Sequence, residues 1–247
     1  MTAIDLRLDG LQPADEHTAE LADRIWPNHF ESISRHNVGE RSFIVAFDRT
    51  ATWDYPNARN IVSFDVVRDS SQATYSLRSS RHATLAFAQN WLVNRGCPPD
   101  VFALTGDVIK PADEMTVRVE DRIRRSGTRL EVVDYLVMDG GDLDGWSMAV
   151  DREDEVLPVR VFLEELQPDQ GTYTVREGAF ADFAAAGDWL EERSTPLPEA
   201  PEYRLEAETL RTSAALSRTA AALPQSSTPV TTAATPVGPT QSPGRSL

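Results

Sequence analysis

Cysteine and lysine are almost absent from this chain of 247 residues, which has one of each, Cys97 and Lys110. A single cysteine excludes a disulfide framework and a metal cluster built on cysteine. Every apolar run is well below the 18 or so residues that a membrane-spanning helix needs. The first ten residues alternate apolar and charged side chains, without the apolar core of a signal peptide. We therefore expect a cytoplasmic protein with no membrane partner.

Motifs for catalysis and cofactor binding are also missing. The sequence has no Gly-x-Ser-x-Gly motif, no phosphate-binding Gly-x4-Gly-Lys loop and no dinucleotide fingerprint. The segment nearest to a calcium loop, residues 139–145, has Gly140 where the first ligand should be, and a hairpin turn explains it as well. The sequence thus predicts no catalytic residue, no cofactor and no metal site.

What the chain does contain is an internal repeat with an offset of 98 residues. The residues Pro-Ala-Asp-Glu-x-Thr at 13–18 return at 111–116, and 8 of the 13 positions from 13 to 25 are identical in the second copy. The same offset gives 9 identities over the 22 positions 74–95. A repeat of fixed period sets the architecture, so we predict two lobes, 1–98 and 99–197.

Each copy predicts the same order of elements. A short strand (4–8 or 101–104) precedes a helix opened by Pro13 or Pro111 at its first turn, and a second helix (82–95 or 179–193) closes the copy. Four strands are predicted between the helices, at 30–36, 42–49, 60–68 and 73–78 in the first copy and at 129–138, 146–151, 157–166 and 171–176 in the second. We expect an α+β fold in which two β-α-β-β-β-β-α units form a pseudo-two-fold protein of antiparallel sheet.

The pattern stops after residue 197. Residues 198–223 predict a weak helix, and residues 224–247 are rich in Thr, Pro and Ser and lack aromatic side chains. Such a segment buries too little apolar surface to offset its chain entropy, so a disordered tail is predicted.

This doubled order of elements resembles the saddle of the TATA-binding protein, in which two such repeats join their sheets edge to edge. The resemblance covers residues 1–197 in the order of elements only, and it implies a two-lobed sheet. It does not imply DNA binding, because the basic underside and the apolar wedges of that family have no match here.

Two pairs of aromatic residues lie at equivalent positions of the copies. Tyr75 and Tyr173 are one pair, and Trp91 and Trp189 are the other. A residue that both copies keep is usually needed for packing, so we predict that these four are structural anchors of the core or of the seam between the lobes.

Charge, in contrast, differs between the copies. Residues 1–98 have 10 Arg and 12 acidic residues, for a net charge of −2, whereas residues 99–197 have 10 basic and 23 acidic residues, for −13. An acidic lobe repels nucleic acid and favours a basic partner. The predicted interaction surface lies around residues 139–155. Its members are Asp139, Asp142, Asp144, Asp151, Glu153, Asp154 and Glu155.

Three functions follow from these observations, in order of preference. The first is a non-enzymatic interaction protein that presents the acidic surface of the second lobe to a protein partner. The alternative is a nucleic-acid-binding protein that uses the Arg-rich first lobe, and the further alternative is an enzyme with a cleft between the lobes. A deep pocket between the lobes favours the third function, a continuous basic stripe favours the second, and the absence of both favours the first.

Overall fold

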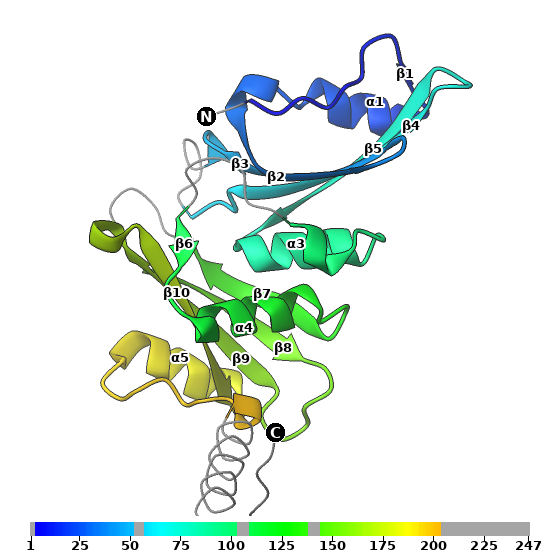
Figure 1. Ribbon diagram of the computed structural model, residues 1–247. Helices are drawn as coiled ribbons and strands as arrows, with labels where there is room; N and C mark the ends of the chain where they lie inside the picture. The colour runs from blue at the N-terminus through cyan, green and yellow to red at the C-terminus, as the bar shows by residue number, and fades with distance from the viewer. Residues whose placement is uncertain (1–2, 52–56, 103–108, 138–143, 204–247) are drawn as a thin grey trace, which may run out of the picture. The chain divides into compact units, whose positions relative to one another are not determined.

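The computed structural model describes residues 3–51, 57–102, 109–137 and 144–203. Residues 1–203 belong to one compact unit, which contains two five-stranded sheets (Figure 1). The predicted α+β class is confirmed. Of the predicted C-terminal helix, only residues 198–203 are described, and the predicted disordered tail, 224–247, lies outside the described residues.

The two sheets have the same strand order. The first sheet has the order β1-β5-β4-β3-β2, and the second has β6-β10-β9-β8-β7. The strands of the first sheet are β1 (Gln12–Pro13), β2 (Phe30–Val38), β3 (Arg41–Asp48), β4 (Ile61–Asp69) and β5 (Thr74–His82). Those of the second are β6 (Lys110–Pro111), β7 (Leu130–Leu136), β8 (Asp144–Asp151), β9 (Val159–Gln167) and β10 (Thr172–Phe180). Each sheet is antiparallel except for its two-residue strand, β1 or β6, which pairs in parallel with β5 or β10.

The register also agrees between the lobes. Tyr75 pairs with Pro13, and Tyr173 pairs with Pro111. The first strand of each hairpin is interrupted by an irregularity at the same place, between Ser32 and Ser34 in β2 and between Val132 and Asp134 in β7. This correspondence supports the internal duplication that the sequence predicts.

Asp residues, rather than proline, begin the first helix of each lobe. Asp15 and Asp113 are the N-caps of α1 (Glu16–Asp23) and α4 (Glu114–Arg124), and each side chain accepts a hydrogen bond from the backbone N–H three residues on. The prediction that Pro13 and Pro111 lie in the first helical turn is wrong, because both prolines lie in the short parallel strands. A side-chain oxygen at the N-cap satisfies a free N–H of the first turn, which proline cannot do.

The predicted first strand of the first lobe is wrong as well. Residues 4–8 are irregular, with a single bridge at the neighbouring Ala3, although Ile4 and Leu6 are buried. In the second lobe, Val101 ends a short 3-10 helix (Pro99–Val101), and residues 103–104 lie outside the described residues. The alternation of apolar residues at 4–8 therefore comes from side chains that pack onto the sheet, and these residues do not form a strand of it.

Helices cover both faces of each sheet. In the first lobe, α1 packs with Phe64 and Leu77 on one face, and α3 (Leu85–Val93) packs with Phe43 and Val45 on the other. In the second lobe, α4 and α5 (Phe183–Glu192) cover opposite faces in the same way (Figure 1). Burial of apolar side chains on two faces supplies most of the stabilisation of such a layered fold.

The lobes contact each other through α3 and α4. The ring of Phe87 meets that of Phe162 edge to face, with centroids 5.6 Å apart, and Arg124 Nε donates to Gln89 Oε1 at 2.7 Å. Within the described residues, no strand of one sheet pairs with a strand of the other. The resemblance to the TATA-binding-protein saddle stays a prediction about the order of elements.

Candidate functional site

A network of charged side chains lies at one end of the second sheet, on the α4 face. Asp151 ends β8 and is fully buried, and its two carboxylate oxygens accept hydrogen bonds of 2.7 Å from Arg129. Arg160 of β9 is also fully buried and lies 3.2 Å from Asp151 and 3.4 Å from Glu177 of β10. Glu177 in turn accepts a hydrogen bond of 2.7 Å from the hydroxyl of Tyr203.

The network connects the C-terminal end of the described chain to the sheet. Arg122 of α4 lies 2.7 Å from Glu202 and 3.1 Å from Glu177, and Arg160 lies 3.1 Å from Glu202. Burial opposes ionisation of the Asp151 carboxyl. The hydrogen bonds from the Arg129 guanidinium and the Glu153 backbone N–H, together with the charges of Arg129 and Arg160, nevertheless hold its pKa below the usual range. Burial raises the pKa of Glu177 despite the opposing pull of Arg122, Tyr203 and Arg160.

This network belongs to the second lobe alone. The repeat places Val62 at the position of Arg160, and Ser79 at that of Glu177. Asp48, the counterpart of Asp151, pairs instead with Arg81 at 2.5 Å. A group present in one copy only is a candidate for function, but every carboxylate of this network already has a guanidinium partner.

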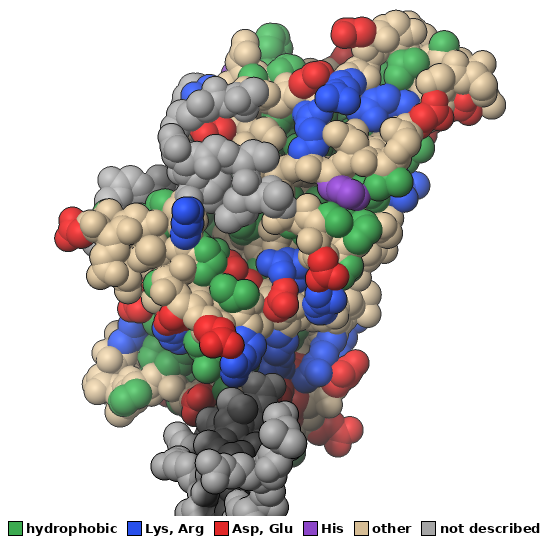
Figure 2. Space-filling view, viewed as in Figure 1, with side chains coloured by type: hydrophobic (Ala, Val, Ile, Leu, Met, Phe, Trp, Pro, Cys, Tyr) green, Lys and Arg blue, Asp and Glu red, His purple; other side chains and the backbone are tan. Residues whose placement is uncertain are grey.

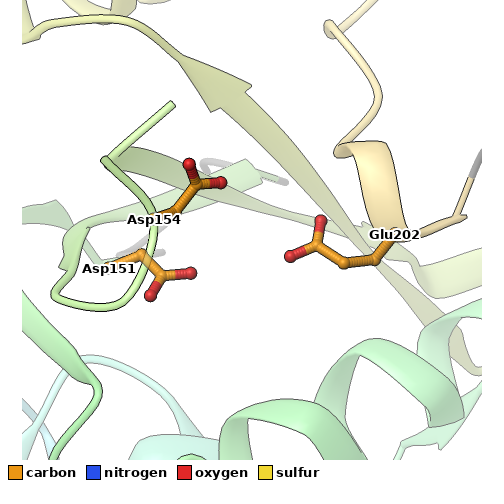
Figure 3. A group of neighbouring side chains, drawn as sticks. All are labelled: Asp151, Asp154 and Glu202. Atoms are coloured by element: carbon orange, nitrogen blue, oxygen red, sulfur yellow. The ribbon is translucent and has the colours of Figure 1, made fainter. Parts of the chain in front are cut away.

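Three carboxylates of the network are close enough to be considered as metal ligands. One oxygen each from Asp151, Asp154 and Glu202 lies within 4.8 Å of the others, and the side chain of Glu202 points toward the two aspartates (Figure 3). Arg160 lies within 3.2 Å of all three carboxylates. A guanidinium already occupies the position of a cation, so this cluster holds the C-terminal segment and is not a candidate metal site.

Only some of the seven residues of the predicted acidic surface are exposed. Asp151 is buried, so the prediction that it belongs to an exposed acidic surface is wrong. Charge counted along the chain does not reveal burial, and here Arg129 and Arg160 compensate the buried carboxylate. Asp154 pairs with Arg160 at 2.7 Å, and Asp144 pairs with Arg193. Glu153 and Glu155 are exposed, whereas Asp139 and Asp142 lie outside the described residues. On the face in Figure 2, acidic and basic side chains alternate and do not form one acidic patch.

The four predicted anchors lie in equivalent elements. Tyr75 and Tyr173 begin β5 and β10, and Trp91 and Trp189 lie in α3 and α5. Tyr75 is buried in the core of the first lobe, and the other three pack at the edges of core clusters. A structural role fits all four.

A cavity of about 230 Å³ lies where the two lobes meet. Its polar lining comes from the first lobe: Arg59, Ser80, Arg81, His82, Asn90 and Asn94. Its apolar walls come from both lobes and include Phe87, Trp91, Leu130 and Val132. A cavity of mixed lining between two lobes is a common type of ligand site, although this volume is below the range of about 300–1,000 Å³ that is typical.

Three of the lining side chains, those of Asn90, His82 and Arg59, have a buried polar atom without a hydrogen-bond partner among the described residues. Asn90 is 6% exposed, and its amide nitrogen donates to the carbonyl oxygen of Gly127 at 2.9 Å, which leaves Oδ1 buried and unpaired. His82 Nε2 is also buried and unpaired. An unsatisfied buried polar atom costs about 1–3 kcal/mol, so a ligand that completes these hydrogen bonds gains that energy.

Positive charge lies beside these atoms. The Arg59 guanidinium stacks over the ring of Tyr135 at 4.5 Å, and its Nε is buried without a hydrogen-bond acceptor in the described part of the chain. The guanidinium of Arg81 already forms an ion pair with Asp48. The charge of the cavity therefore favours an anionic group, and Arg59 is the side chain best placed to bind it.

His82 is held in its neutral form. Burial, with smaller contributions from the charges of Arg59 and Arg95, lowers its pKa to about 3. A group with this pKa is a weak base and is almost never protonated at neutral pH, so it is poorly matched to acid–base catalysis. It remains suited to hydrogen bonding as a neutral imidazole.

Sequence reasoning missed the residues of this cavity. From the sequence, His82 and Asn90 have no predicted site role, and Arg59 is only one of the arginines of the Arg-rich first lobe. Two differences between the copies could have indicated this site. Ser80 and His82 of the first lobe stand where the second lobe has Gly178 and Phe180, so this end of β5 is more polar than the equivalent end of β10.

Among the described residues, no helix is long and apolar enough to cross a membrane. Comparison with models of protein families, with curated proteins and with solved structures gave no match.

Proposed function

We propose that this protein is a non-enzymatic binding protein and that the cavity between its lobes receives an anionic group of its ligand. The observation that carries the proposal is a pair of buried side-chain atoms, Asn90 Oδ1 and His82 Nε2, that have no hydrogen-bond partner among the described residues and lie beside the Arg59 guanidinium. Hydrogen bonds to a charged partner are worth about 1.5–3 kcal/mol each. A cavity between the lobes is also the feature expected of an enzyme, but the depressed pKa of His82 makes this imidazole poorly suited to acid–base catalysis, so binding is the function that we propose.

Titration calorimetry with N-acetylglutamate amide as the probe tests this proposal. The probe has a carboxylate for Arg59 and amide N–H groups for Asn90 Oδ1, and its neutral glutamine analogue is the matched ligand. We expect the carboxylate probe to bind at least tenfold more tightly than the neutral analogue, because it gains a charge-assisted contact.

Two variants locate the binding. Arg59→Gln should abolish the preference for the carboxylate, whereas Arg24→Gln, which removes an exposed arginine of α1's C-terminal end, should leave it unchanged. Equal binding of both probes, or an equal effect of both variants, would contradict the proposal.

The acidic second lobe remains the second candidate site, for a basic protein partner. Glu153 and Glu155 are exposed near the turn after β8, and Asp188, Glu191 and Glu192 are exposed on α5. A test of this surface should replace Glu153 and Glu155 but keep Asp154, because the Asp154 carboxylate accepts hydrogen bonds of 3.0 Å from the backbone of Val156 and Leu157.

Nucleic-acid binding by the first lobe has less support. Several arginines of this lobe already bind acceptors within the lobe. Arg41 makes a bidentate contact of 2.8 Å with Asp65, Arg68 donates to the carbonyl oxygens of Leu6 and Arg7, and Arg49 donates to that of Asn28. Such arginines are less free to neutralise phosphates.

A further inference from the structure

The second lobe shows how the edge of such a sheet is filled by an extended segment. After α5 the chain returns to β10, where Gly178 forms an antiparallel bridge with Glu199 and the Ala179 N–H donates to the Pro198 carbonyl oxygen at 3.0 Å. Glu202 and Tyr203 then enter the charged network. Residues 198–199 thus lie on the part of the β10 edge that β6 leaves free, and Ala200 and Tyr203 then pack in the core cluster of the α4 face.

The side chain of Leu197 packs against Gly178, Phe180 and Trp189, which together form a socket for it. Its side chain packs in the same apolar cluster as Phe180 and Trp189. It also lies so close to Gly178 that a Cβ at this position would be 2.4 Å from Leu197 Cδ1. The glycine therefore makes room for an apolar side chain.

In the first lobe the same three positions line the cavity. The offset of the repeat and the strand registers place Ser80, His82 and Trp91 at the positions of Gly178, Phe180 and Trp189. Among the described residues, the first lobe's own chain does not return to this edge: after α3 it enters the 3-10 helix Pro99–Val101, and Val101 packs with the α3-side cluster.

In the part of the chain that the structure describes, the edge of β5 beside the cavity is correspondingly open. Arg81 is the counterpart of Ala179, and within the described residues its backbone N–H donates to no backbone acceptor. Unpaired edge groups of this kind bind an added strand through main-chain hydrogen bonds, with specificity set by pockets for alternate side chains.

We propose that the first lobe binds an extended acidic segment of a partner protein, which adds to the edge of β5 and places an Asp or Glu side chain where Leu197 lies in the second lobe. This inference rests on the proposed function and names its ligand. The polar socket of Ser80 and His82, with Asn90 and Arg59 beside it, replaces the apolar socket of the second lobe. The added Cβ and hydroxyl of Ser80 also take up space that a leucine would need.

The experiment uses two peptides based on the chain's own segment 196–203, both acetylated and amidated. One is Pro-Glu-Pro-Glu-Ala-Pro-Glu-Tyr, and the other keeps the native leucine at the second position. Calorimetry with the full chain should show that the glutamate peptide binds at least tenfold more tightly than the leucine peptide. It should also bind more tightly than N-acetylglutamate amide, because the backbone contacts add to the side-chain contact. Arg59→Gln should remove the preference for glutamate, and Arg24→Gln should not.

Each other outcome is decisive. Equal affinity for both peptides, or a preference for leucine, overturns the acidic socket. Binding of N-acetylglutamate amide without any gain from the glutamate peptide overturns the added strand but leaves the proposed function standing. If neither the peptide nor the small probe binds, both proposals fail.

Discussion

Replacing Arg160 by leucine should lower the free energy of unfolding by about 3–5 kcal/mol, the largest effect that we expect from a single substitution. Arg160 is fully buried and lies within 3.4 Å of Asp151, Asp154, Glu177 and Glu202. Removal of Arg160 leaves the buried carboxylates of Asp151 and Glu177 with only Arg129 and Arg122 as cationic partners. Removing one partner of a buried ion pair costs far more than the net stabilisation that the intact pair provides. Urea denaturation at pH 7 measures the change.

The first lobe supplies the matched control. The double variant Arg160→Val and Glu177→Ser installs the residues that occupy the equivalent positions 62 and 79, and it removes one charge of each sign. We expect it to cost less than Arg160→Leu alone, because buried ion pairs are often replaced at low cost when both partners are removed. A cost below about 1 kcal/mol for Arg160→Leu would show that the network contributes little to holding residues 198–203 on the sheet.

The second large effect is a pH dependence that originates at His82. The folded state holds the pKa of this imidazole at about 3, whereas the unfolded chain protonates it near 6.5. Between these values the unfolded state binds the extra proton, so stability is complete above about pH 6.5 and falls as the pH decreases. The loss between pH 7 and pH 5 should be about 2 kcal/mol, at 1.36 kcal/mol for each pH unit below 6.5.

His82→Phe, which copies Phe180 of the second lobe, should remove this loss. Carboxylates that titrate in the same range are common to both proteins, so the difference between the two pH profiles isolates His82. His17→Gln, at an exposed position of α1, is the control for the removal of a histidine from the surface. If the parent and His82→Phe have the same profile from pH 7 to pH 5, the imidazole is solvated and the buried character of the cavity is wrong.

The repeat made much of the fold predictable. The eight long strands lie within about four residues of their predicted ends, and the second helix of each lobe is shorter than predicted because Thr84 and Asp182 cap it. The two-residue parallel strands were missed, because so short an element has no periodicity. Each of these strands is set by backbone pairing with a strand that is distant in sequence, β1 with β5 and β6 with β10.

The site was much less predictable, for a physical reason. Charge counted along the chain gave the acidic surface, but Asp151 and Asp154 are neutralised by Arg129 and Arg160. Arg129 and Arg160 lie 22 and 6 residues from these partners. The cavity needs Arg59, Asn90 and Leu130 together. Only the contact between the lobes brings these residues into one place, and single-sequence patterns do not encode it.

The most direct test of the inter-lobe site is an NMR titration of the 15N-labelled protein with the glutamate peptide. The side-chain N–H signals of Trp91, Asn90 and Asn94 should shift in a saturable way, because all three line the cavity. The indole N–H of Trp189 is the internal control; it occupies the equivalent position of the second lobe and donates to the Thr195 carbonyl oxygen at 3.0 Å. Shifts at Trp91 and the two asparagines, with Trp189 unchanged, are the result that we predict. Shifts confined to Trp189 or to residues outside the cavity, with Trp91 and Asn90 unchanged at saturation, would contradict the assignment of the cavity as the binding site.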